Sequence, residues 1–193
     1  MEDIILIGGG GHCKSCIDVI EQEGKYRIAG IIDLPEKAGE KILDYKISGS
    51  DEDLEALSRQ YRNFLVTLGF VKSPELRIRL YKRLKELGVN LPVIISPRAY
   101  VSKHALISEG TIVMHGSIVN ASAHIGANCI INSRALVEHD AFVCDHCHIA
   151  TAAVVNGGVV VGAGSFIGSG AITVQYTLVP EYSFIKAGSL FKS

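Results

Sequence analysis

The sequence predicts an α/β half-domain of the Rossmann type in residues 1–96, followed by a parallel β-helix in residues 97–193. Two observations lead to this prediction. In the first part, short apolar runs alternate with amphipathic stretches, and four consecutive glycines follow the first run. In the second part, an aliphatic residue returns at every sixth position, which is a period that neither a lone strand nor a βα unit produces.

Composition narrows the class of protein. The chain has 193 residues, of which 48% are apolar and 20% are charged, so a folded globular protein is expected. A net charge of −1 leaves no basic field for nucleic acid or an anionic membrane. The apolar stretches are shorter than the roughly 18–20 residues that a membrane helix needs. Because the acidic start lacks the basic region of a signal peptide and the five cysteines are an odd number, we expect a reducing, cytoplasmic setting.

The first elements form a strand, a glycine turn and a helix. Residues 4–7 are continuously apolar, which is typical of a strand buried on both faces. The glycines at 8–11 follow, and then comes a helix whose apolar face includes Cys16, Val19 and Ile20. A turn of this kind presents backbone N–H groups and a helix N-terminus, which together bind phosphate.

The next elements continue the alternation. Strands are predicted at 28–32, ending at Asp33, at 64–68, ending before Gly69, and at 93–95. Ser73, Pro74 and Glu75 are typical of a helix start. The buried face of that helix is predicted to be Leu76, Leu80, Leu84 and Leu87. A full dinucleotide domain needs more strands, so the pattern favours a mononucleotide or a nucleotide sugar over NAD.

The hexad repeat predicts the β-helix. From Val101 to Val179, thirteen of the fourteen residues at six-residue spacing are aliphatic, and the remaining one is Thr173. Four positions after each of them comes a small or β-branched residue. Three hexads make one 18-residue coil of a triangular prism, with the aliphatic side chains inside and the small residues at the corners. Residues 101–178 correspond to a little over four coils.

Polar residues concentrate between Asn132 and His148. His139 is the third residue of its hexad and His148 is the sixth of the next, so neither points inward and both can face solvent or a neighbour. They are half a coil apart on a prism whose side is about 18–20 Å long at strand rise. A cleft that uses both histidines must therefore lie between two subunits.

Metal binding is not expected. The pairs Cys13/Cys16 and Cys144/Cys147 have zinc-like spacing. Cys147, however, falls at an inward position one coil after Cys129, which assigns it to the core.

The motif Asn132-x5-Glu138-His139-Asp140-x7-His148 resembles the PglD/NeuD-like branch of the hexapeptide-repeat acyltransferases. The glycines before His12, the stretch 30–33 and the pair Leu68-Gly69 resemble the same branch, so the resemblance covers nearly the whole chain. It implies a left-handed β-helix, a homotrimer with active sites between subunits, and transfer of acetyl from acetyl-coenzyme A (acetyl-CoA) to a nucleotide-linked sugar.

The resemblance also implies roles for individual residues. His139 is the general base, His148 contacts the acetyl thioester, and Asp140, with Glu138 as the alternative, raises the basicity of His139. The residues implied to line the coenzyme are Gly157, Ser169 and Ala187. Those implied to contact the nucleotide sugar are Gly10, Gly11, His12, Asp33 and Gly69, while Asn132 orients a side chain or the sugar. These roles suit acetyl transfer, because an imidazole that titrates near neutrality can take the proton from an attacking amine.

The predicted function is N-acetylation of a UDP-linked 4-amino-4,6-dideoxy sugar for surface glycans. Three alternatives stay open: O-acetylation of a sialic-acid-type sugar, N-acetylation of a GDP-linked amino sugar, and a non-catalytic trimeric scaffold. The sequence departs from the family pattern at Leu34 and Phe70, where relatives carry polar residues, and at the C-terminal Gly188–Lys192 segment.

Overall fold

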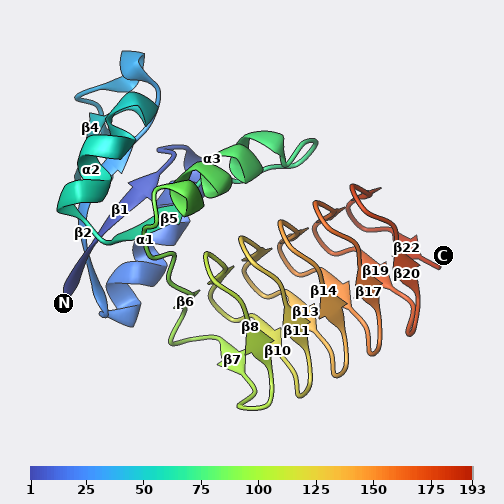
Figure 1. Cartoon of the computed structure of the whole chain (residues 1–193). Coiled ribbons are helices and arrows are strands. Elements are labelled where there is room, and N and C mark those ends of the chain that lie inside the picture. Colours follow the sequence, from blue (N-terminus) through green and yellow to red (C-terminus); the bar gives the residue numbers. More distant parts are fainter. Residues whose placement is uncertain (193) are drawn as a thin grey trace.

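The computed structural model describes residues 1–192, which form a small α/β half and a long triangular prism beside it (Figure 1). The α/β half contains a five-stranded sheet of order β3-β4-β2-β1-β5. Its four parallel strands are β1 (Glu2–Ile7), β2 (Tyr26–Ile32), β4 (Tyr45–Gly49) and β5 (Asn63–Val66). The short β3 (Lys41–Ile42) pairs antiparallel with β4, and neither of these two strands was predicted.

Helices cover both faces of this sheet. Helix α1 (Gly11–Glu23) packs on one face and ends at Gly24, whose φ of 68° forms a left-handed cap. Helices α2 (Leu54–Gln60) and α3 (Glu75–Glu86) pack on the other face. The α/β half also contains two single 3₁₀ turns, Pro35–Lys37 and Asp51–Asp53. Coverage on both sides explains why the first strand is continuously apolar.

The buried face of α3 differs from the prediction. Leu80 and Leu84 are buried as expected, but Leu76 is 41% exposed and Arg77 is fully buried. The leucine spacing therefore identified the helix and most of its buried face, but it wrongly included Leu76 and did not include Arg77.

The prism consists of two-residue strands in three parallel sheets, each strand pairing with the one 18 residues later. The first sheet contains β6 (Ile94–Ile95), β9 (Ile112–Val113), β12 (Ile130–Ile131), β15 (His148–Ile149), β18 (Phe166–Ile167) and β21 (Phe184–Ile185). The second contains β7 (Tyr100–Val101), β10 (Ile118–Val119), β13 (Leu136–Val137), β16 (Val154–Val155), β19 (Ile172–Thr173) and β22 (Leu190–Phe191). The third contains β8 (Leu106–Ile107), β11 (His124–Ile125), β14 (Phe142–Val143), β17 (Val160–Val161) and β20 (Leu178–Val179).

The hexad prediction is confirmed. The inward aliphatic residues and the small residues four positions later form one continuous buried core along the prism. Between strands, one turn residue has positive φ, and this position is often Gly or, as at Asn128 and Asp140, a short polar residue that tolerates the left-handed region. The fold is thus a left-handed parallel β-helix preceded by a Rossmann-like half-domain. The helix exceeds four coils because its strands continue to Leu190–Phe191.

The strand predicted at 93–95 belongs to the prism. Within β6, Ile94 pairs with Ile112 and Ile95 with Val113 of β9, so assigning this strand to the α/β half was wrong. We infer that the β-helix begins with β6 rather than at residue 97.

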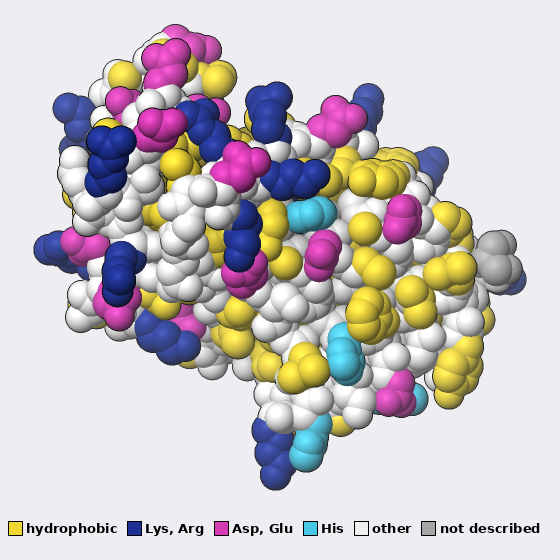
Figure 2. All heavy atoms as spheres, in the orientation of Figure 1, with side chains coloured by type: hydrophobic (Ala, Val, Ile, Leu, Met, Phe, Trp, Pro, Cys, Tyr) yellow, Lys and Arg dark blue, Asp and Glu magenta, His cyan; other side chains and the backbone are white. Residues whose placement is uncertain are grey.

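Helix α1 joins the two halves. Its side chains pack both on the α/β sheet and on the outward residues of the first prism sheet, namely Ile94, Ile112 and Ile130. Each fully buried isoleucine there contributes about 1.5–3 kcal/mol. The other two prism sheets leave Ile118, Phe142 and similar outward residues exposed. Figure 2 shows apolar side chains concentrated over the prism half of the face that it displays. None of the helices in residues 1–192 has the length and apolar character to cross a membrane.

Candidate active site

A cavity of about 690 Å³ lies where the two halves meet. Its walls come from the N-terminus of α1, the loop that follows β5, the turns after β12 and β15, and His148 of β15. Six of the predicted site residues line it together: Gly10, Gly11, His12, Gly69, Asn132 and His148. The fold therefore brings into one place residues that lie up to 138 positions apart in the sequence.

The glycine turn is shaped by close contacts on one side and is open on the other. Gly8 has a φ of +105°, and a Cβ there would lie 3.1 Å from the amide nitrogen of Leu68. The hydroxyl of Thr67 donates to the carbonyl of Gly8 at 2.7 Å and fixes the turn against β5. A Cβ at Gly10 or Gly11 would meet nothing within 4 Å. The first turn of α1 is therefore open to a ligand, and no side chain caps it.

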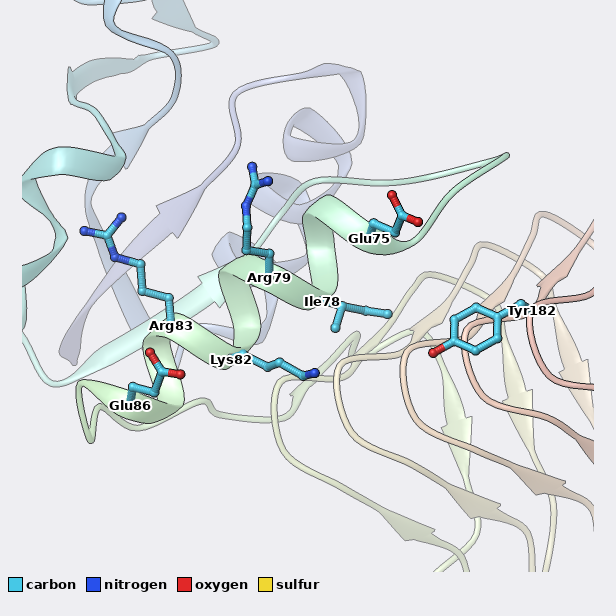
Figure 3. Close-up of a pocket in the computed structure, with 7 residues that line it drawn as sticks. All are labelled: Glu75, Ile78, Arg79, Lys82, Arg83, Glu86 and Tyr182. Atoms are coloured by element: carbon cyan, nitrogen blue, oxygen red, sulfur yellow. The ribbon is translucent and has the colours of Figure 1, made fainter.

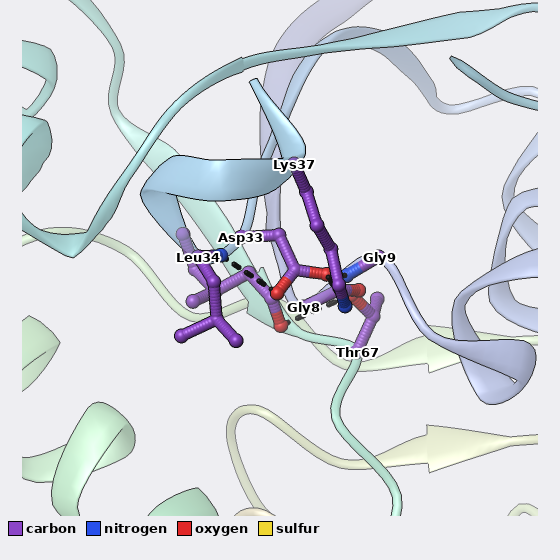
Figure 4. Close-up of polar contacts among 7 residues, drawn as sticks. Gly8, Gly9, Asp33, Leu34, Lys37 and Thr67 are labelled. Atoms are coloured by element: carbon purple, nitrogen blue, oxygen red, sulfur yellow. Dashed lines mark hydrogen bonds and ion pairs between the residues drawn. The ribbon is translucent and has the colours of Figure 1, made fainter. Parts of the chain in front are cut away.

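Asp33 lies in an adjoining cavity of about 240 Å³ rather than in the main one. The two cavities share Gly10 and Leu68. The carboxylate of Asp33 accepts hydrogen bonds from the N–H of Gly9 at 2.8 Å and of Leu34 at 2.8 Å, and it pairs with Lys37 at 3.0 Å (Figure 4). Burial alone would raise the pKa of Asp33, but these hydrogen bonds outweigh burial and lower it. The side chain is thus an anion that holds the turn in shape.

His148 points out of the prism, as predicted, but it is covered by the α/β half and does not face solvent. Its Nδ1 lies 2.7 Å from the carbonyl oxygen of Phe70 in the α/β half, which can only accept, so Nδ1 carries the proton. Its Nε2 lies 3.0 Å from the amide nitrogen of Asn132, whose oxygen accepts from the N–H of Ser133. Burial lowers the pKa of His148 to about 4, although the Phe70 contact opposes this shift. The ring is therefore neutral, and its Nε2 accepts.

His12 lies beside this ring at the start of α1. The two ring centroids are 6.3 Å apart, and Nε2 of His12 is buried without a partner. Burial lowers the pKa of His12 to about 3, with further contributions from Arg77 and His148. A Cβ at Gly69 would lie 3.2 Å from the Cβ of His12, so the glycine lets the loop close over this histidine.

His139 and Asp140 lie on a different corner of the prism, in the turn between β13 and β14. The His139 Nδ1 is 2.8 Å from the Asp140 carboxylate, and the two side chains are 52% and 64% exposed. The hydrogen bond that the His139 ring donates to the Asp140 carboxylate raises the pKa of His139. Glu138 instead accepts from the Asn120 amide at 2.8 Å. Asp140 is therefore the carboxylate that orients the ring of His139.

The predicted coenzyme residues divide between two corners. Gly157 lies one coil after His139, and a Cβ there would come within 2.8 Å of the Cε1 and Nε2 atoms of that imidazole. The imidazole of His139 therefore packs directly against Gly157, and a side chain at this position would displace it. Ser169 and Ala187 are exposed on the corner after the first prism sheet. They continue an 18-residue column that begins with Ser133 and Thr151 in the wall of the main cavity.

Sequence reasoning missed several residues of the cavity. Ser133 and Thr151 could have been found from the column that contains Ser169 and Ala187. Phe70 carries the carbonyl that fixes His148, and a backbone contact leaves no signal in a single sequence.

Another cavity, of about 700 Å³, lies between α3 and Tyr182 (Figure 3). It contains none of the predicted site residues. Its charged lining mixes basic Arg79, Lys82 and Arg83 with acidic Glu75 and Glu86, which is typical of a solvated helix surface. Among residues 1–192 no group of three or more metal-ligating side chains gathers.

The chain is similar to known proteins in sequence and in fold. Residues 3–84 match the family model of the PglD N-terminal domain. A histidine-to-asparagine mutant of perosamine N-acetyltransferase from Caulobacter crescentus, in complex with CoA and GDP-perosamine, is 30% identical with a TM-score of 0.93. That match covers 100% of this chain and 89% of the other.

A second solved structure is the acetyltransferase domain of PglB from Neisseria gonorrhoeae FA1090 in complex with acetyl-CoA. It is 29% identical with a TM-score of 0.88, over 97% of this chain and 89% of that one. No curated protein sequence matches. The perosamine N-acetyltransferase is 30% identical to this chain over the whole length of this chain. The chain therefore belongs to the PglD/NeuD-like sugar acetyltransferases, which are acyltransferase enzymes of the hexapeptide-repeat superfamily that use acetyl-CoA.

Proposed function

We propose that this enzyme transfers acetyl from acetyl-CoA to the amine of a nucleotide-linked amino sugar. The observation that carries the proposal is the pair of cavities that meet at Gly10, where the uncapped N-terminus of α1 opens. A helix N-terminus with free N–H groups favours a diphosphate. The complex of the 30% identical relative with CoA and GDP-perosamine supports the same substrate class.

The two cavities suit the two ends of such a substrate. Besides the ion pair of Asp33 and Lys37, the smaller one is lined by apolar residues that include Leu34 and Leu76, and by the charged residues Asp51 and Arg79. This lining suits a nucleobase. The larger one carries the polar groups Asn132, His12 and His148, which suits an amino sugar.

The general base is proposed to be His139 of a second copy of the chain. Neither imidazole in the cavity suits proton removal at neutral pH, since their pKa values are about 3 and about 4. His139 has a raised pKa, an exposed ring and a carboxylate that orients it. Because its corner differs from that of the cavity, the proposal places the active sites between subunits of a homotrimer. The exposed apolar residues on both prism sheets that flank His139 support such contacts.

In this arrangement the chain's own groups perform the proton transfer. Acetyl-CoA supplies the acetyl group as a thioester. As the sugar nitrogen bonds to the acetyl carbon, Nε2 of His139 accepts the proton that this nitrogen loses, while Asp140 stabilises the imidazolium. The carbon–sulfur bond then breaks, and the departing thiolate takes up the proton. The column of small residues from Ser133 and Thr151 to Ser169 and Ala187 leaves room for the coenzyme arm beside the cavity.

The two candidate amino sugars differ in the nucleotide that they carry. The sequence resemblance favours a UDP-linked 4-amino-4,6-dideoxy sugar, whereas the perosamine N-acetyltransferase was crystallised with a GDP-linked sugar. The UDP sugar remains our proposal, with the GDP sugar as its alternative. Acetyl-CoA as donor also fits the expected cytoplasmic setting.

The test is a thiol-release assay with acetyl-CoA and a panel of acceptors: UDP-4-amino sugars, a GDP-4-amino sugar and sialic acids. We expect rapid release with one nucleotide amino sugar and a fall of about a hundredfold or more in His139→Ala. Release only with a sialic acid would move the reaction to an oxygen acceptor and contradict the role of the glycine turn. No thiol release with any acceptor, together with no CoA binding, would favour a non-catalytic scaffold protein.

A further inference from the structure

Arg77 is a buried cation without an acidic partner. It lies in α3, its side chain is 0% exposed, and no ion pair among residues 1–192 includes it. Its guanidinium donates to three backbone carbonyls instead: Val66 at 2.6 Å, Leu68 at 2.9 Å and Asn128 at 3.1 Å. One nitrogen, Nη2, is buried with no partner. Burying a charge in this way costs free energy, so a well-packed apolar residue would serve stability better.

The three carbonyls come from the two chain segments that carry opposite walls of the active-site cavity. Val66 ends β5, and Leu68 is in the loop that lines the cavity. Asn128 lies in the prism turn just before β12, after which Asn132 follows. A single guanidinium therefore ties the cavity loop to the prism coil that supplies the opposite wall.

The loop held by Arg77 fixes His148. Two residues after Leu68, the carbonyl of Phe70 accepts the Nδ1–H of His148, and Nε2 is left for the amide of Asn132. A shift of the loop would break this contact and release the ring. The position of the guanidinium thus affects the orientation of His148 in the cavity through one short loop.

The charge of Arg77 acts on the same rings. The titratable groups close to it are His12 from α1, His146 from the turn before β15, His148 from β15, and the thiols of Cys16 and Cys129. Burial is the larger cause, but Arg77 also lowers the pKa of all three histidines. Burial raises the pKa of Cys16, so this thiol is neutral and does not balance the charge.

We infer that Arg77 is a positioning residue for acetyl transfer, which holds the loop 67–70 against the prism and keeps His148 with Nδ1–H on Phe70 and Nε2 toward Asn132. The kinetic part of this inference rests on the proposed function. The orientation of His148 does not, because it can be measured without substrate.

Wild-type protein provides the first test, by ¹⁵N NMR of the histidine side chains. We expect His148 to be the neutral Nδ1–H tautomer from pH 8 to about pH 5, since its pKa is about 4. An Nε2–H tautomer, or an imidazolium near neutral pH, would overturn the inference whether or not the acceptor sugar has been identified.

Two variants then separate geometry from charge. Arg77→Lys keeps the positive charge, but its single ammonium cannot reproduce the fork that reaches three carbonyls. Arg77→Met removes both. Arg83→Met, on the same helix and outside the active-site cavity, is the matched control. Folding is checked by circular dichroism and thermal unfolding before any rate is compared.

We expect Arg77→Lys to lower kcat by about tenfold to a hundredfold with little change in KM for acetyl-CoA, because small misplacements of reacting groups have effects of that size. Arg77→Met should show the same loss and, in addition, a raised pKa of His12. The control should match the wild type. Wild-type kcat in both folded Arg77 variants would contradict the inference. So would a loss of rate that follows only the fraction of unfolded protein.

Discussion

At the scale of single residues, the three histidines of the site differ because of their surroundings. His12 and His148 are buried beside a cation, and their pKa values are about 3 and about 4. His139 is exposed beside a carboxylate that raises its pKa. Environments that push the pKa values of similar groups apart identify which one exchanges protons during the reaction. This contrast supports His139 as the base and the two buried rings as hydrogen-bonding groups.

Asp140→Asn tests the role of the carboxylate. The base form of His139 is populated above its pKa, and Asp140 raises that pKa. The acidic limb of the kcat/KM profile should therefore shift to lower pH in the variant. The plateau should fall, because the imidazolium loses its stabilising partner. A profile measured from pH 5 to 9 checks both effects. Glu138→Gln should shift the limb less, because Glu138 raises the pKa of His139 by less than Asp140 does. An unchanged limb would show that Asp140 does not set the basicity of His139.

Gly157→Ala tests the contact between Gly157 and the imidazole of His139. The new Cβ would come within 2.8 Å of Cε1 and Nε2 of His139, so the ring must move. We expect activity to fall by about a hundredfold, with the unfolding midpoint in urea nearly unchanged. In a double-mutant cycle with His139→Ala, the second change should add almost nothing. Additive losses would mean that Gly157 acts on the coenzyme instead.

At the scale of elements, the sequence predicted what depends on periodicity and on local chemistry. The strand, glycine turn and helix at the start and the whole β-helix follow from apolar spacing, because the inward side chains repeat without a break. The strands β3 and β4 and helix α2 were missed. On the buried face of α3, Arg77 was also missed, because it is held by carbonyls from distant segments, and leucine spacing cannot report these.

The glycine turn provides a test at this scale. Thr67→Val removes the hydroxyl that donates to the carbonyls of Gly8 and Ile7 while keeping the shape of the side chain. We expect the free energy of unfolding to fall by about 1–3 kcal/mol, measured by urea denaturation. KM for the nucleotide sugar should rise, because the first turn of α1 is no longer held. Ser58→Ala, on the exposed side of α2, is the control. Unchanged stability and KM would contradict this role.

At the scale of the whole molecule, the predicted site residues are divided between two places. The fold gathers Gly10, Gly11, His12, Gly69, Asn132 and His148 in one cavity. It leaves His139, Asp140 and Gly157 on another corner of the prism. The sequence could indicate this division, because half a coil separates His139 from His148. It could not indicate that His148 is covered by the α/β half, since the docking of one half on the other is not periodic.

The central claim is that a cavity and a base from different copies of the chain make each active site. It is tested by mixing two inactive variants. His139→Ala keeps the cavity and lacks the base. Gly11→Glu keeps the base and places a carboxylate at the open N-terminus of α1, where it repels a diphosphate without filling packed space.

Co-expression of the two variants in equal amounts should give oligomers in which some sites combine an intact cavity with an intact His139. For random assembly of a ring with one such site per interface, about a quarter of wild-type activity is expected. The thiol-release rate of the mixture, compared with each variant alone, measures this directly. About a quarter of the wild-type rate supports the account, whereas a mixture no more active than its parents would place the cavity and its base within one chain.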